Sequence, residues 1–105
     1  MSGADNTSYT VRSTTVATTL TAQDTVLLVS PTGGSIVITV PAASSLQPGR
    51  NFIVRRDATA TNTVTITPAS GTINGAANLV LAAGAIGCAE LYSDGTNWFS
   101  LGASN

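Results

Sequence analysis

Short stretches in which apolar and polar residues alternate recur along most of the chain. The clearest covers residues 63–68, TVTITP, where Val64 and Ile66 share one face and the threonines share the other. Residues 35–40, SIVITV, alternate in the same way. Because successive side chains of a strand point to opposite faces of a sheet, both stretches predict strands with one buried face. Residues 25–30, TVLLVS, are continuously apolar and predict a strand covered on both faces.

The remaining strands follow from similar but shorter patterns. They are predicted at 14–20, 51–57 and 78–82, with a closing hairpin formed by 86–93 and 96–101. Turn residues separate them, at Pro31–Gly34, which is interpreted as a hairpin connection, and at Pro48-Gly49, Asn74-Gly75 and Asp94-Gly95. Residues 42–49 are too short and too interrupted for more than one helical turn.

About eight or nine short strands, with turn signals every ~8–12 residues, are typical of a small sandwich or barrel. We therefore predict an all-β fold, a small antiparallel sandwich resembling a jelly roll. Residues 1–13 are expected to form a flexible N-terminal arm because they begin polar and small, and residues 14–105 are expected to form the β domain.

Charge is scarce in this chain of 105 residues. Charged residues make up 9%, with neither Lys nor His, and the net charge is -1. Nucleic-acid binding needs a basic footprint, and docking on acidic membranes needs one too, so neither partner is expected. No apolar run approaches the ~18 residues of a membrane span, and the first residues lack a signal-peptide core, so synthesis and assembly in a cytoplasm are expected.

The neutral surface also has a consequence for assembly. Natural sheets often block edge-to-edge association with Lys, and this chain has none. Threonine, serine and asparagine must supply solubility instead. We therefore expect sheet edges and apolar patches to be covered by other subunits.

No pattern for catalysis or metal binding stands out. Nucleophilic catalysis lacks a histidine base, and Cys88 lies in an apolar run as a small hydrophobic residue. The five acids do not pair convincingly, and the loop from Asp94 to Asn97 offers at most two oxygen ligands for calcium. We predict that the protein is not an enzyme and has no catalytic residue, no metal and no cofactor.

Two charged or polar segments are candidate contact sites. In the arm, Asp5, Asn6, Tyr9 and Arg12 are either part of a loose tail or a segment that orders against a partner.

The densest charge cluster is Arg55-Arg56-Asp57. Its arginines either pair within the chain, with Asp57, Glu90 or Asp24, or form ion pairs with another subunit or partner, for which the planar arginine fork is suited.

The aromatic residues of the closing hairpin form the third candidate. Trp98 and Phe99 are adjacent and must point to opposite faces of the sheet. Trp98 either caps the core or joins Tyr92 and Asn97 in a platform for a sugar or a neighbouring subunit. Tyr92 and Asn97 are expected to lie across from one another.

The succession of motifs resembles a β module of tailed-phage virion proteins. It runs from the strand at 26–30 through SIVITVPAA (35–43), PGRNFIVRRDA (48–58) and NTVTITPASGTINGA (62–76) to LYSDGTNWFSL (91–101). The resemblance covers roughly residues 18–101, and such modules occur in head decoration (cement) proteins and in tail-fibre or receptor-binding segments.

The resemblance implies a homotrimer and a place on the virion. The chain has a short polar arm and no coiled coil, collagen repeat or β-helix shaft, which favours a head decoration protein over a fibre tip. Such a protein binds the major capsid protein on the head exterior and stabilises the shell, here with Asp5, Asn6, Tyr9 and Arg12 in the attaching arm. The alternative is a tail-fibre or tip protein that binds a carbohydrate receptor through Tyr92, Asn97 and Trp98.

Overall fold

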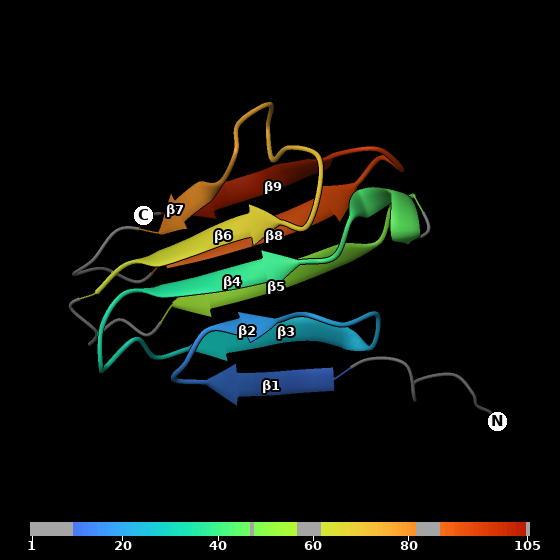
Figure 1. Cartoon of the computed structure of the whole chain (residues 1–105). Coiled ribbons are helices and arrows are strands. Elements are labelled where there is room, and N and C mark those ends of the chain that lie inside the picture. The colour runs from blue at the N-terminus through green and yellow to red at the C-terminus, as the bar shows by residue number, and fades with distance from the viewer. Residues whose placement is uncertain (1–9, 47, 57–61, 82–86, 105) are drawn as a thin grey trace, which may run out of the picture.

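The protein is described here from a computed structural model, which defines residues 10–46, 48–56, 62–81 and 87–104 (Figure 1). This part of the chain forms nine strands and one short 3-10 helix. The strands are β1 (Thr10–Thr14), β2 (Thr18–Thr19), β3 (Asp24–Val29), β4 (Ile36–Val40), β5 (Asn51–Arg56), β6 (Val64–Pro68), β7 (Leu79–Leu81), β8 (Gly87–Ser93) and β9 (Trp98–Ser104), and the helix is η2 (Ala43–Ser45). The prediction of an all-β domain is confirmed.

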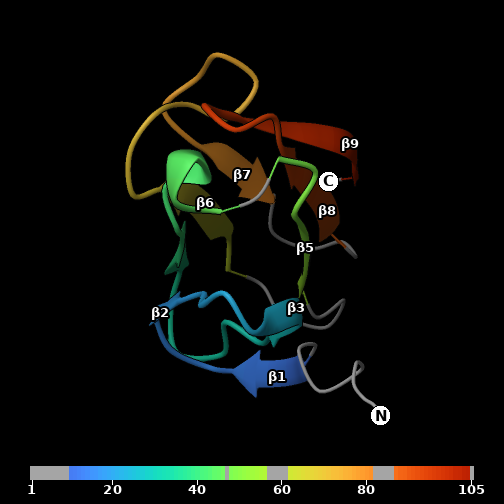
Figure 2. The same cartoon turned by 90° about the vertical axis from the view of Figure 1, so that its right-hand side faces the viewer.

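The strands build two sheets that pack face to face. One has five strands in the order β1-β3-β5-β8-β9, and the other has four in the order β2-β4-β6-β7. From β1 to β6 the chain alternates between the two sheets, so that each pair of strands adds one step to both layers. Figure 1 shows this stacking from blue to red along the sheets, and Figure 2 shows the two layers from the end.

The strand directions differ from the antiparallel arrangement that the sequence predicts. β1, β3 and β5 run parallel to one another, as do β2, β4 and β6. Only the pairs β5–β8, β6–β7 and β8–β9 among the named strands are antiparallel. The cause is the alternation between layers, because a chain that returns to the same sheet after visiting the other one arrives in its original direction. The segment Pro31–Gly34 is accordingly a crossover between sheets, and its prediction as a hairpin is wrong.

The core lies between the sheets and follows the predicted alternation. Ile36, Ile38 and Val40 of β4 are buried, as are Val64 and Ile66 of β6, which lie beside them. The inward residues of the five-stranded sheet meet them from the other layer. Each fully buried aliphatic side chain contributes about 1.5–3 kcal/mol to the stability of the fold, so this interior supplies most of the driving force for folding.

Trp98 completes the core at the end of the closing hairpin. It is fully buried, its ring centroid lies 5.4 Å from that of Phe52, and its indole Nε1 donates to the Pro41 carbonyl at 2.9 Å. The hydrogen bond satisfies the one polar group that the indole brings into the interior. Of the two interpretations of Trp98, the core cap describes its position.

Several boundaries shift relative to the sequence predictions. Residues 10–13, expected within the arm, belong to β1. This strand ends at Thr14, whereas the sequence predicted that a strand begins there. In β3, Leu28 is 39% exposed, so that strand is not covered on both faces as predicted. The short helix at Ala43–Ser45 and the positive φ angles of Asn74 and Gly75 agree with the predicted helical turn and Asn-Gly turn.

Candidate functional site

Arg12 and Asp24 form a clamp at the β1–β2 end of the sandwich. The Arg12 Nε and Nη2 atoms donate to the two carboxylate oxygens of Asp24, each at 2.8 Å. Nη2 also donates to the carbonyl of Thr19 in the other sheet at 3.2 Å. Asp24 is 2% exposed and accepts a further bond from the Thr21 backbone N–H at 2.8 Å. The Asp24 carboxylate raises the pKa of Arg12, since the ion pair favours the charged guanidinium.

The clamp changes the interpretation of the predicted attaching arm. Arg12 holds the two sheets together from within β1, so its guanidinium is engaged by its own chain. Asp5, Asn6 and Tyr9 lie outside the described residues. Of the four predicted arm residues, the structure therefore places only Arg12, and places it in the fold.

The predicted charge cluster around Arg55 is divided between the two sides of the sheet. Arg56 points into the sandwich, is fully buried, and its Nε donates to the carbonyl of Asn62 at 2.8 Å. Arg55 points outward and is exposed, and Glu90 lies on the same outer side of the neighbouring strand. Asp57 lies outside the described residues. Arg56 is therefore not available to a partner, whereas Arg55 and Glu90 share one surface.

Arg50, which follows the Pro48-Gly49 turn, connects two segments of the fold. Its guanidinium lies 4.4 Å from the centre of the Phe52 ring, and its Nη2 donates to the carbonyls of Ala22 (2.9 Å) and Asp24. Through these contacts Arg50 ties the turn before β3 to the start of β5. A cation above an aromatic ring contributes about 0.5–1 kcal/mol at exposed sites.

The three residues of the predicted ligand platform do not come together. Trp98 is buried on the inner side of β9, whereas Tyr92 lies on the outer side and pairs with Phe99, with ring centroids 5.7 Å apart. The side-chain oxygen of Asn97 accepts from the backbone N–H of Thr72 at 3.0 Å. Asn97 thus fastens one loop to another, and the expected pairing of Tyr92 with Asn97 is replaced by Tyr92 with Phe99.

The hairpin turn between β8 and β9 is held by Asp94. Its Oδ1 accepts from the backbone N–H groups of Thr96 and Asn97, both at 2.8 Å, and these bonds lower the pKa of Asp94 because they favour the carboxylate. Gly95 takes the positive φ of 98°. The role of Asp94 and Gly95 is therefore to form the turn between β8 and β9.

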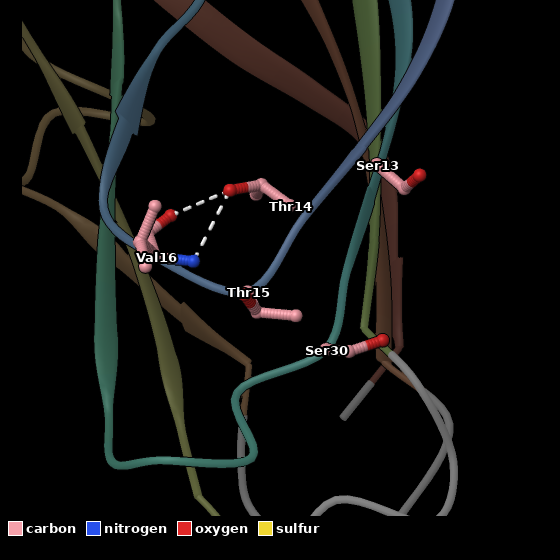
Figure 3. Close-up of a pocket in the computed structure, with 5 residues that line it drawn as sticks. All are labelled: Ser13, Thr14, Thr15, Val16 and Ser30. Carbon is pink, nitrogen blue, oxygen red and sulfur yellow. Dashed lines mark hydrogen bonds between the residues drawn. The ribbon is translucent and has the colours of Figure 1, made fainter.

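A pocket lies at the corner where β1 turns toward β2 (Figure 3). It is an open hollow of about 470 Å³, lined by Ser13, Thr14, Thr15, Val16 and Ser30. Thr14 Oγ1 is committed to the turn, since it donates to the Val16 carbonyl at 2.9 Å and accepts from the Val16 N–H at 3.1 Å. The lining brings together hydroxyls and one exposed valine without a charged or nucleophilic group, so it offers no chemistry beyond weak polar contacts.

The largest candidate surface is the outer face of the five-stranded sheet, which we call the outer face. Alternation places on it the residues whose neighbours along the strand are buried. Its apolar members are Val11, Val26, Leu28, Ile53, Cys88, Tyr92 and Phe99, and its polar members include Asn51, Arg55 and Glu90. Val11 is 67% exposed.

The four-stranded sheet presents a different surface, which we call the threonine face. It consists of Thr19, Val37, Thr39, Thr65, Thr67 and Val80. Its hydroxyls retain contact with water, whereas the outer face combines aliphatic and aromatic side chains. Sequence reasoning missed both surfaces as units because the registers that assemble them join residues far apart in the chain. One signal was available in the sequence: Val26, Leu28 and Ile53 are apolar although they alternate with the residues that face the core.

Within the described ranges, no three His, Cys, Asp or Glu side chains gather as a metal site would need. Helices in the same ranges fall short of the length and hydrophobicity of a membrane span. Compared with known proteins, the chain matches no protein-family model and no curated protein.

Proposed function

We propose that the chain is a homotrimeric head decoration protein of a tailed phage, which binds the major capsid protein on the exterior of the mature head. The observation that carries the proposal is that both faces of the sandwich expose large apolar side chains. They are Val11 and Leu28 on the outer face and Val37 and Val80 on the threonine face, with exposed fractions between 39% and 67%. Exposed apolar side chains that gather on the face of a sheet are typical of protein–protein contact sites.

The charge pattern supports the same proposal. Of the arginines, Arg12, Arg50 and Arg56 are engaged in holding the fold together. The chain has no lysine to block association at a sheet edge, and among the described residues only Arg55 and Glu90 bring charge to the outer face. A subunit whose surfaces are covered in an assembly has no need of the charges that keep a monomer soluble.

The mechanism is stabilisation by differential binding. A protein that binds the expanded shell and not its disrupted form stabilises the shell by RT ln(1 + [L]/Kd), about 2.7 kcal/mol at a concentration of 100 Kd. A trimer strengthens this effect, because three weak footprints held together act at a high effective concentration. In this mechanism the protein holds neighbouring capsid subunits together.

Addition of the purified protein to mature heads that lack it tests the proposal. Saturable binding and a higher temperature of head disruption are expected, and absence of binding would overturn it. Deletion of residues 1–9 should weaken attachment, and equal saturation by the shortened protein would remove the arm from the mechanism. Adsorption of the protein to host cells or glycans in place of heads would assign it to the tail.

A further inference from the structure

The outer face carries opposite charges on adjacent strands, set among apolar side chains. We propose that this face is the surface through which copies of the chain associate, with Arg55 of one copy against Glu90 of the next. This inference rests on the homotrimer of the proposed function and deepens it by naming the surface and the contact.

The apolar part of the face is continuous across three strands. Val11 of β1 pairs with Val26 of β3, and Val26 pairs with Ile53 of β5, so three β-branched side chains form one row. Leu28 lies beside this row and is 39% exposed. The buried centre of a protein interface is typically poor in charged residues and rich in apolar and aromatic side chains.

The two charges lie at the end of this row: Glu90 of β8 pairs with Ile53, and Arg55 follows Ile53 by two residues on β5. Arg55 pairs with Cys88 across β5 and β8, and Glu90 follows two residues later on the same side. Arg55 and Glu90 are therefore diagonal neighbours, with about 7–8 Å between their backbones. Arg55 and Glu90, both in the described part of the chain, form no ion pair with each other, so they do not neutralise each other.

The position of Glu90 is fixed by its own chain. Asn51 Nδ2 donates to Glu90 Oε2 at 3.1 Å. A carboxylate that is already held loses less side-chain entropy when it binds, which strengthens an intermolecular contact. The guanidinium of Arg55 is exposed and presents the planar fork that binds a carboxylate with two hydrogen bonds.

A second copy is the partner that this charge pattern selects. Among the described residues, one positive and one negative group leave the face neutral, so a strongly charged partner gains nothing from it, whereas a second copy offers a carboxylate to Arg55 and a guanidinium to Glu90. In a closed ring each copy directs Arg55 to one neighbour and Glu90 to the other, which gives one ion pair for each interface of a trimer.

Charge reversal tests the contact. The variants Arg55→Glu and Glu90→Arg each place like charges in every interface, and the double variant restores opposite charges with exchanged positions. Each single reversal is expected to raise the dissociation constant of the assembly by more than ~10-fold, and the double variant is expected to recover at least half of the native assembly. Sedimentation measures the oligomer, and Trp98 fluorescence checks that each variant remains folded.

A matched pair of lysine substitutions tests the surface as a whole. Leu28→Lys on the outer face should dissociate the assembly, whereas Val37→Lys on the threonine face, at a position of similar exposure (47% against 39%), should leave it intact. Dissociation by Val37→Lys alone, or single reversals that leave the oligomer unchanged, would overturn the inference.

The same measurements separate this inference from the proposed function. If Leu28→Lys stays trimeric and still binds heads, the outer face is not the interface and the proposed function stands. If the native protein is a monomer that does not bind heads, both proposals fail.

Discussion

Replacement of Asp24 by alanine probes the clamp that joins the two sheets. The variant loses two hydrogen bonds of 2.8 Å from Arg12 and one of 2.8 Å from the Thr21 N–H. Hydrogen bonds to charged groups contribute about 1.5–3 kcal/mol each when buried. Because the Arg12 side chain is 42% exposed and water replaces part of the interaction, we expect a total loss of about 2–3 kcal/mol.

The loss is large relative to the stability of a small domain, which is about 5–15 kcal/mol. A reduction of this size corresponds to a fall in Tm of about 10–20 °C. Urea unfolding followed by Trp98 fluorescence measures it directly, since Trp98 is the only tryptophan and is fully buried. All variants are compared at one protein concentration, because the association proposed above would add to apparent stability.

A double-mutant cycle isolates the ion pair from the rest of the clamp. Arg12→Ala, Asp24→Ala and the double variant should give a coupling energy of about 1–2 kcal/mol. Asp24→Asn keeps an acceptor for the Thr21 N–H and should cost less than Asp24→Ala. A loss below about 0.5 kcal/mol for Asp24→Ala, the value of an exposed surface pair, would refute the reasoning.

Three further predictions concern the loops and the hairpin. Gly71→Ala should destabilise the protein by about 1–3 kcal/mol in urea unfolding, because Gly71 has a φ of 82° and an added Cβ would lie 2.7 Å from a side-chain oxygen. The control variant Gly33→Ala, whose added Cβ would have nothing within 4 Å, should have little effect. Trp98→Phe should cost about 1–3 kcal/mol through the lost bond to Pro41, measured by circular dichroism, and an unchanged unfolding midpoint would contradict this role. The lowered pKa of Asp94 contributes stability at pH values above its ordinary pKa of 3.8, and this stability is lost as the pH falls through the lower pKa of the folded state. The stability of Asp94→Asn should therefore depend less on acid pH than that of the native protein, and parallel profiles of stability against pH would disprove this.

The burial pattern of the fold was largely predictable from the sequence. Strict alternation in residues 63–68 fixes which side chains of β6 face the core, and the burial of Trp98 agrees with one of the two interpretations that the sequence left open. The assignment of the β6 side chains needs only the two-residue period of a strand and the hydrophobic effect. These local rules hold irrespective of which strands become neighbours.

The pairing of the strands was not predictable in the same way. A segment such as Pro31–Gly34 has the same turn residues whether the chain folds back within a sheet or crosses to the other layer, so local chemistry does not distinguish a hairpin from a crossover. Parallel neighbours β3 and β5 align Val26 with Ile53, and nothing in either residue specifies the other. The clamp escaped prediction for the same reason, since Arg12 meets Asp24 only after β1 and β3 have paired.

The alternation of strands between layers has a mechanical consequence. Of the eight connections between consecutive strands, only β6–β7 and β8–β9 stay within one sheet, which leaves six that pass between sheets. A tensile load that pulls one sheet away from the other is therefore borne by covalent backbone at six places, in addition to the packing of the core. Rupture of the sandwich requires strands to be drawn out of both sheets together, so resistance to force and resistance to heat are set by different parts of the molecule.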